Sequence, residues 1–250
     1  MRPRIAIPVP HSGDPEYVAR ALPQYVRAVE MAGGDAVSVP LDQGLAEIAR
    51  LAESCDGVLL PGSGADVDPG KYNAVRHPKT DKADVKRETV DEFVLRDAYV
   101  HRKPVLGICY GLQMLNVYCR GSLVQHIESE INHEAGRKVP IAHSVVVDPG
   151  SRLGGIVKDA ANDLAHVPVN SSHHQSAEAV GTGLRISARC PDDGVVEAIE
   201  GTAPDHFVLA VQWHPERSVD EDAASRAIFS ALIQAAASRH RELVEGTTAR

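Results

Sequence analysis

The chain has 250 residues, of which 43% are hydrophobic and 24% are charged, so its composition is that of an ordinary globular protein. Its formal net charge of -8 argues against a dedicated surface for nucleic acid or for anionic membranes. No apolar stretch approaches the roughly 20 residues that a membrane-spanning helix needs, and the proline-rich start at residues 1–9 does not fit a signal peptide.

Cysteine usage and length indicate where the protein works and how many domains it has. The cysteines are Cys55, Cys109, Cys119 and Cys190, and they show no C-x-x-C spacing. That pattern is typical of a reducing compartment, so we expect a cytoplasmic protein. Without repeats or a linker, residues 1–250 are expected to form one domain, with residues 242–250 as a frayed tail.

Strands and helices alternate through the first half of the sequence. The expected strands are residues 4–9, 36–39, 57–60 and 104–108. The expected helices are residues 17–32, 45–54, 88–101 and 112–117. This βαβα order predicts an α/β fold with a mostly parallel central sheet flanked by helices.

The second half changes to successive strands that short turns connect. These strands are expected at residues 143–147, 166–169, 184–189, 195–199 and 207–213. Short turns favour antiparallel neighbours, so we expect extra antiparallel strands in this half. A closing helix over residues 220–241 is expected from its acidic start and basic end.

Cys109 lies in the turn between an expected strand and an expected helix. The sequence Gly-Ile-Cys-Tyr-Gly at residues 107–111 follows the apolar run directly. This is the elbow of G-x-S-x-G hydrolases with sulfur in place of oxygen, and the glycines leave room for the sharp turn. A helix N-terminus favours thiolate, so we expect an exposed Cys109 with a lowered pKa. The alternative is an inert core cysteine.

A His-Pro-Glu step follows the last expected strand. Pro215 favours extended geometry at His214, and side chains two residues apart in an extended segment project to the same side. Glu216 can therefore orient the imidazole of His214 toward a thiol. With Cys109, these residues supply the nucleophile, base and orienting group that acyl transfer requires. Taken alone, His214 is equally well interpreted as a polar cap at a strand end.

A loop of small residues follows the expected strand 57–60. Gly62, Ser63 and Gly64 leave backbone N–H groups approachable, and one of these with the N–H of Tyr110 would form an oxyanion hole. A phosphate loop is the rival interpretation, but the segment lacks the third glycine of G-x-G-x-x-G and has no G-K-[ST]. A plain turn is the simplest alternative.

Two adjacent histidines lie in the segment Asn-Ser-Ser-His-His-Gln at residues 170–175. His173 and His174 suggest a metal site, with His126, His133 and His143 as further candidates. However, adjacent side chains point apart, and no H-E-x-x-H or comparable zinc spacing is present. We therefore expect no metal here, and a polar cluster that lines a pocket or satisfies a loop.

In this order, the motifs resemble a class I glutamine amidotransferase-type hydrolase, and more closely the γ-glutamyl-γ-aminobutyrate hydrolase family, peptidase family C26. The resemblance covers nearly the whole chain, from Pro8 to about Arg241. The motifs that carry it are residues 61–69 with Tyr72, 107–113 with 116–117, 121–125, 170–175 and 212–216.

The resemblance implies a role for each motif. Cys109, His214 and Glu216 match the family's catalytic triad. The backbone amides that match its oxyanion hole are those of Gly62, Ser63, Gly64 and Tyr110. The positions that match contacts to the γ-glutamyl part of the substrate are Gln113, Ser171, Ser172, His173 and His174.

Three positions depart from the family pattern. Tyr110 stands where the family usually has Arg, His126 where it usually has an acidic residue, and Glu88 where it usually has Asp after Arg87. The N–H of residue 110 does not depend on the side chain, so the oxyanion hole is unaffected. We expect Tyr110 and His126 to border the pocket mouth and to influence which amine leaves.

The reaction implied is hydrolysis of a small-molecule γ-glutamyl amide through a γ-glutamyl thioester, without a cofactor, as in polyamine catabolism. Neither nucleic acid nor a membrane is expected as a partner, and a homodimer would be unsurprising. The leaving group stays open between γ-aminobutyrate, another amine, an aromatic amine and ammonia. Two other functions also stay open: a glutaminase that serves a synthetase in trans, and a non-catalytic binding module.

Overall fold

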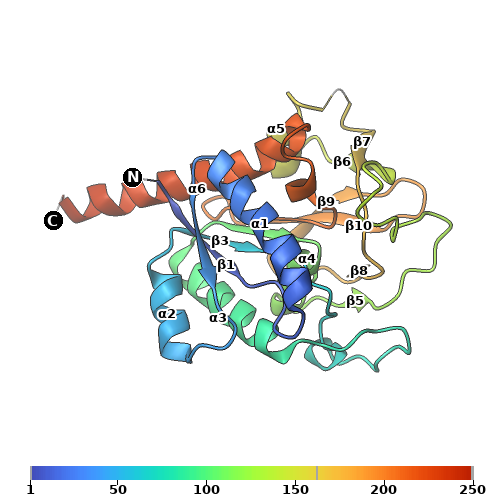
Figure 1. Ribbon diagram of the computed structural model, residues 1–250. Helices are drawn as coiled ribbons and strands as arrows, with labels where there is room; N and C mark the ends of the chain where they lie inside the picture. Colours follow the sequence, from blue (N-terminus) through green and yellow to red (C-terminus); the bar gives the residue numbers. More distant parts are fainter. Residues whose placement is uncertain (1, 162, 249–250) are drawn as a thin grey trace.

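The computed structural model describes residues 2–161 and 163–248. Its main sheet has the strand order β2-β1-β3-β4-β11-β10-β9-β6-β7. The short strands β5 and β8 pair with each other beside it (Figure 1). The fold is α/β, as the sequence predicts.

One half of the main sheet is parallel. Its strands are β1 (Arg4–Pro8), β2 (Asp35–Val39), β3 (Gly57–Leu60), β4 (Val105–Ile108) and β11 (Val208–Val211). β4 lies between β3 and β11 and pairs with both in parallel register. Near-continuous apolar sequence and full burial of β3, β4 and β11 fit strands covered on both faces. The carboxyl ends of these strands therefore meet at one edge, next to Cys109.

The other half of the sheet is antiparallel and adds to β11. Its strands are β10 (Val196–Gly201), β9 (Leu184–Arg189), β6 (His143–Val147) and β7 (Val167–Val169). β10 pairs antiparallel with both β11 and β9, and β6 joins β9 to β7. The small antiparallel pair consists of β5 (Leu123–Val124) and β8 (Ser176–Ala177).

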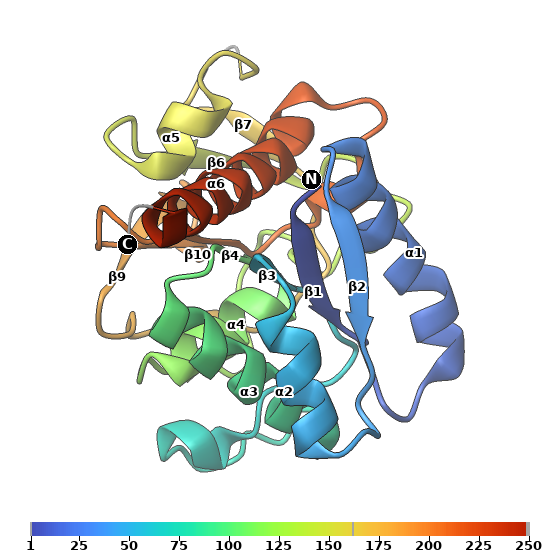
Figure 2. The same ribbon diagram turned by 90° about the vertical axis from the view of Figure 1, so that its left-hand side faces the viewer.

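Helices cover the sheet on both faces and bury a separate apolar cluster on each (Figure 2). One face carries α1 (Pro15–Met31), α5 (Arg152–Val157) and α6 (Ala223–Thr248). The opposite face carries α2 (Leu45–Glu53), α3 (Val85–His101) and α4 (Tyr110–Tyr118). Successive residues of β1 alternate between the two clusters, with Ile5 and Ile7 in one and Ala6 in the other, as the period of a strand requires.

The sequence predictions and the structure differ in a few elements. β5, β8 and α5 were not expected, because two-residue strands and a single six-residue helix have no periodicity to detect. α6 begins at Ala223 and continues to Thr248, beyond the expected end at Arg241. Of the expected tail, residues 249–250 lie outside the described residues. Within residues 2–161 and 163–248, none of the helices combines the length and the apolar character that a bilayer crossing requires.

Candidate active site

Cys109 occupies a sharp turn between β4 and α4. Its backbone has a φ of 54° and a ψ of -106°, a positive-φ conformation that is strained for any residue with a Cβ. The turn has no room for side chains on either flank. A Cβ on Gly111 would lie 2.2 Å from the Leu60 carbonyl oxygen, and a Cβ on Gly107 would lie 2.8 Å from that of Gly111. The geometry is thus the elbow that the sequence predicts.

The environment of the Cys109 thiol differs from the expectation. The residue is only 5% exposed, and burial raises the pKa of the thiol to about 12, despite the lowering effect of the nearby Arg217 guanidinium and the Tyr110 N–H. The expectation of an exposed thiol with a lowered pKa is therefore wrong for this state of the protein. The helix N-terminus is present, but its partial charge does not offset the loss of water around a thiolate. Cys109 rests as a protonated thiol.

Neighbouring strands place His214 beside this elbow. β11 pairs in parallel with β4, and the N–H of Cys109 donates to the carbonyl of Val211 at 2.8 Å. The chain after β11 then passes the elbow and carries His214. Asn170 holds the backbone of His214 at two points, since its Oδ1 accepts from the His214 N–H at 3.0 Å and its Nδ2 donates to the His214 carbonyl at 2.9 Å. The backbone position of His214 is therefore fixed from a separate loop.

Glu216 orients the imidazole of His214, as the spacing predicts. Nδ1 of His214 lies 2.8 Å from Oε1 of Glu216, so the Nδ1–H tautomer leaves Nε2 as the free acceptor. Burial lowers the pKa of His214, while the Glu216 carboxylate opposes that shift. Because its pKa is lowered, His214 is neutral at neutral pH. A neutral imidazole can accept the thiol proton of Cys109, as a general base must.

Gly62 lies next to both Cys109 and the imidazole of His214. A Cβ on Gly62 would lie 3.1 Å from Cε1 of His214 and 3.7 Å from Cβ of Cys109. A side chain at this position would crowd the imidazole, so glycine keeps the space beside the two residues open. The structure brings Cys109, His214 and Glu216 together, although they come from two segments about a hundred residues apart in sequence.

The candidate oxyanion donors are only partly free. The Tyr110 N–H lies close enough to the sulfur of Cys109 to lower the pKa of the thiol. The N–H of Gly62 donates instead to the Tyr25 hydroxyl at 3.0 Å. The N–H groups of Ser63 and Gly64 have no hydrogen-bond partner among the residues that the structure describes. Of the loop amides, Ser63 and Gly64 therefore remain available as donors.

Arg87 holds the backbone next to the site in place, a role that was not predicted from the sequence. The side chain is fully buried and bonds to both oxygens of Asp91 at 2.8 and 2.9 Å. Its other nitrogens donate to the carbonyls of Pro10 at 2.8 Å and Pro61 at 2.7 Å. Arg87 thereby fixes the residue just before Gly62.

Tyr110 does not border a pocket mouth, so that expectation is wrong. Its side chain is 1% exposed and packs with Val67 and Met114, and the Arg87 guanidinium lies 4.9 Å from its ring centroid. The Cys-Tyr step of the elbow points this side chain into the protein rather than toward the thiol. His126 is half-buried and lines a surface hollow with His173 and His174.

The residues expected to contact the γ-glutamyl part of the substrate differ in their burial. Gln113, Ser171 and His173 are buried. Gln113 Nε2 donates to the Gln175 carbonyl at 3.1 Å, and Ser171 Oγ donates to the His133 carbonyl at 2.7 Å. Gln113 Nε2 and Ser171 Oγ therefore already have partners in the protein, whereas Nε2 of His173 makes no hydrogen bond within the described residues.

Ser172 and His174 lie nearer the surface than those three residues. Ser172 Oγ accepts from Arg217 Nη1 at 2.8 Å, and Nε2 of His174 lies 3.1 Å from Oδ1 of Asp66. This ion pair raises the pKa of His174. Ser172 is connected to the triad through Arg217, whose Nε lies 3.6 Å from Glu216.

Arginine side chains gather beside the triad. Burial lowers the pKa of Arg137, and the guanidinium groups of Arg217 and Arg20 lower it further. The three positive charges therefore act on one another, and the Glu216 carboxylate partly offsets them. These residues were not predicted from the sequence, although Arg217 directly follows the His-Pro-Glu step.

The side chains of the adjacent residues His173 and His174 point in different directions, as the sequence predicts. His174 points to Asp66, whereas His173 points to Glu197. The structure nevertheless brings His133 and His143 to the same Glu197 carboxylate. Spacing in the sequence gave no sign of this cluster, because its members come from four separate segments.

The match to a known family decides how this arrangement is understood. The family model described as Peptidase C26 matches residues 9–216. The chain belongs to the peptidase C26 family. The resemblance stated from the motifs is thereby confirmed, and a hydrolase acting on amide bonds is the general class of this protein.

Curated relatives agree with this assignment. The chain is 34% identical over 225 residues to γ-glutamyl-γ-aminobutyrate hydrolase PuuD of Escherichia coli, a match that covers 85% of this chain and 84% of PuuD. It is 38% identical over 216 residues to Rv2859c of Mycobacterium tuberculosis, provisionally named a glutamine amidotransferase, covering 85% of this chain and 66% of that protein.

Solved structures show the same fold at low sequence identity. The glutaminase domain of Trypanosoma brucei CTPS, determined with bound acivicin, matches with a TM-score of 0.62 and 19% identity, covering 94% of each chain. PurLQS from Thermotoga maritima matches with a TM-score of 0.60 and 17% identity, covering 94% of this chain and 99% of that chain.

Proposed function

We propose that this protein hydrolyses the γ-glutamyl amide bond of a small γ-glutamyl compound to glutamate and a free amine. The observation that carries the proposal is the juxtaposition of a strained Cys109 with a neutral His214 that Glu216 orients. The 34% identity to a relative named γ-glutamyl-γ-aminobutyrate hydrolase supports the choice of the γ-glutamyl group.

In the proposed first step, Nε2 of His214 removes the thiol proton as the sulfur of Cys109 attacks the side-chain amide carbonyl. The new oxyanion accepts from the Tyr110 N–H and from a loop amide at Ser63 or Gly64. His214 then returns its proton to the departing amine, and a γ-glutamyl thioester remains on Cys109.

In the second step, water attacks the thioester carbonyl while His214 accepts its proton. The thiolate leaves and takes that proton back, which restores the resting thiol and releases glutamate. No cofactor enters either step. Neighbouring guanidinium groups of Arg20, Arg137 and Arg217 favour a substrate that carries carboxylate groups, as γ-glutamyl compounds do.

A panel of γ-glutamyl amides tests the proposal. Purified protein is incubated alone with γ-glutamyl-γ-aminobutyrate, other γ-glutamyl amines, γ-glutamyl anilides and glutamine, and both glutamate and amine are quantified. We expect equal amounts of the two products from at least one compound other than glutamine. Release of ammonia from glutamine alone would favour a glutaminase that serves a synthetase in trans, the alternative suggested by the name of the 38% identical relative. No release from any compound would contradict the proposal.

A further inference from the structure

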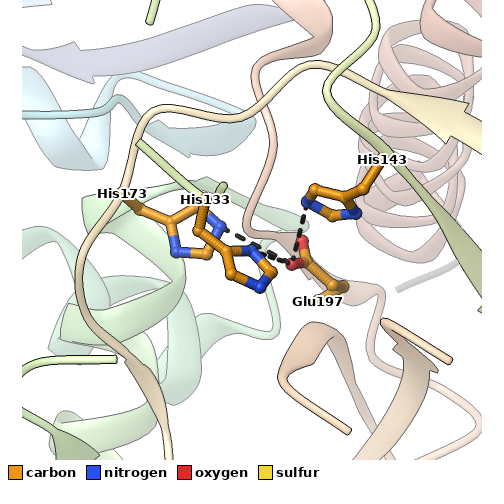
Figure 3. Close-up of side chains that lie close together, drawn as sticks. All are labelled: His133, His143, His173 and Glu197. Carbon is orange, nitrogen blue, oxygen red and sulfur yellow. Dashed lines mark ion pairs between the residues drawn. The ribbon is translucent and has the colours of Figure 1, made fainter. Parts of the chain in front are cut away.

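A buried cluster of three histidines and a glutamate lies in the antiparallel half of the protein (Figure 3). Its members are His133, His143, His173 and Glu197, all of them buried. They come from the loop before β6, the start of β6, the loop after β7 and the interior of β10. Figure 3 shows the three imidazole rings converging on the carboxylate of Glu197.

The atoms that face one another in this cluster are all potential metal ligands, at ion-pair distance from Glu197 but without a hydrogen bond. Nδ1 of His133 and Nε2 of both His143 and His173 lie 3.2, 3.5 and 3.5 Å from Oε1 of Glu197. None of these atoms, and neither oxygen of Glu197, makes a hydrogen bond within the described residues. A buried carboxylate that accepts no hydrogen bond is destabilising, so native proteins rarely leave one in this state.

The outer nitrogens of the three rings determine what the inner nitrogens can do. Nδ1 of His173 lies 3.0 Å from the carbonyl of Gln175, and Nδ1 of His143 lies 3.2 Å from that of Ser144. Nε2 of His133 lies 2.8 Å from Oδ2 of Asp193. Because these oxygens only accept, each outer nitrogen is the protonated one in a neutral ring.

In the neutral rings, three nitrogen lone pairs therefore point at a carboxylate, which is a repulsive arrangement unless a metal ion or a proton lies among them. Outer hydrogen bonds from imidazole N–H groups to carbonyls and carboxylates are what metal-bound histidines make. In tetrahedral zinc sites the metal–ligand bonds are about 2.0–2.1 Å long, which places neighbouring ligand atoms roughly 3.3–3.4 Å apart. The three separations of 3.2 to 3.5 Å between the ring nitrogens and Oε1 of Glu197 agree with that edge length, and all four ligand atoms lie within 4.8 Å of one another.

We propose that His133, His143, His173 and Glu197 bind one zinc ion in a closed tetrahedral site with a structural role. Nitrogen donors in the majority favour zinc over magnesium or calcium, which prefer oxygen ligands. Four protein ligands complete the coordination and leave no open position for a reacting water.

The site is placed to support the catalytic histidine. His173 lies three residues after Asn170, whose side chain holds the backbone of His214 at both polar atoms. The carbonyl of Glu197 accepts from the N–H of Gln212 at 2.7 Å, two residues before His214. Zinc would thus tie the two segments that fix the position of His214 to the loop that carries His133.

Metal content of the purified full-length chain tests this proposal without reference to activity. The protein is prepared without chelators, exchanged into metal-free buffer and analysed by inductively coupled plasma mass spectrometry. We expect about one zinc per chain in the wild type and a loss of that zinc in the variant His143→Ala. His174→Ala is the matched control, since His174 is adjacent to His173 but points to Asp66, and it should retain zinc.

Two further measurements complete the test. The first uses a more conservative variant in case His143→Ala does not fold, and the second reports the coordination geometry of the site. Glu197→Gln keeps the shape of the side chain and is expected to weaken zinc binding by at least about 10-fold. Cobalt(II) exchanged into the wild type is expected to give the intense visible absorption of a tetrahedral complex. Equal zinc content in the wild type and both ligand variants would overturn the proposal. So would a wild type that takes up no zinc and whose thermal midpoint does not change when Zn²⁺ is added, because protons shared among the rings would then satisfy the cluster.

Discussion

The elbow at Cys109 and the cluster at Glu197 are both buried and polar, but they are built in different ways. The elbow is made by consecutive residues, and its geometry follows from two glycines and a strand-to-helix turn. The cluster is made by four segments that only the antiparallel pairing of β6, β9 and β10 brings together. Local sites can thus be recognised in a sequence, whereas sites assembled across a sheet become visible only once the strand order is known.

The largest effect expected in the elbow is that of removing its sulfur. Cys109→Ala should lower kcat/KM for the preferred γ-glutamyl amide by on the order of 10⁶-fold, because no other group can form the thioester. The variant should fold, since it only removes one atom from a buried position. Steady-state kinetics with circular dichroism check both points.

The control for that variant is Cys55→Ala. Cys55 is also buried but lies among apolar side chains at the end of α2. Its removal should leave kcat/KM unchanged. Turnover by Cys109→Ala at the wild-type rate would refute the role of the elbow.

The next largest effect is expected at the residue that orients His214. Glu216→Gln should lower kcat by about 10⁴-fold, because an amide no longer favours the tautomer with a free Nε2. The control is Glu200→Gln in the antiparallel half. Glu200 is equally buried but binds Arg185 and the amides of Arg152 and Leu153, so its loss should reduce stability rather than kcat. Equal kcat values for the two variants would contradict the orienting role.

A third test compares the stability effect of adding a Cβ in the crowded elbow with that of adding one in an open helix. Gly111→Ala should reduce the free energy of unfolding by about 3 kcal/mol or prevent folding, because its Cβ would overlap the Leu60 carbonyl. A Cβ on Gly155 in α5 meets nothing within 4 Å. Gly155→Ala should therefore leave stability unchanged or raise it by up to about 1 kcal/mol. Urea denaturation measures both, and similar stabilities would show that the elbow tolerates a side chain.

The smallest effect concerns the protonation state of the pair. Since burial lowers the pKa of His214 below 6.5 and raises that of Cys109 to about 12, the base is neutral above its lowered pKa. The value of kcat/KM should stay level at neutral pH and fall tenfold per pH unit only below pH 6.5. A pH profile from initial rates checks this. A preformed thiolate–imidazolium pair would instead lose activity as the pH rises through the pKa of the imidazolium, and such an alkaline decline would contradict the account.

Most of the fold and the local parts of the site could be predicted from the sequence. The alternation of strands and helices fixed the parallel half, and the motifs at Cys109 and His214 indicated residues that the structure places side by side. What could not be predicted depends on three-dimensional context. The pKa of Cys109 depends on burial. The Gly62 N–H is not free to bind an oxyanion because it donates to the hydroxyl of Tyr25 from α1. The roles of Arg87 and Asn170 depend on which backbone atoms their side chains reach.

The metal expectation illustrates the same limit. Adjacent histidines do point apart, as His173 and His174 show. The absence of zinc spacing, however, excluded only sites built on one helix or one loop. His133 and His143 lie on either side of a turn, and Glu197 lies on β10, far from both in the sequence, so no local pattern joins them.

The central claim is that Cys109 carries the acyl group during the reaction. The most direct measurement is mass spectrometry of the protein after acid quenching during turnover of a γ-glutamyl amide, followed by peptide mapping. The account predicts one γ-glutamyl group on the peptide that contains Cys109, absent from Cys109→Ala. Turnover with no acyl group on that peptide, or with the group attached to another residue, would contradict it.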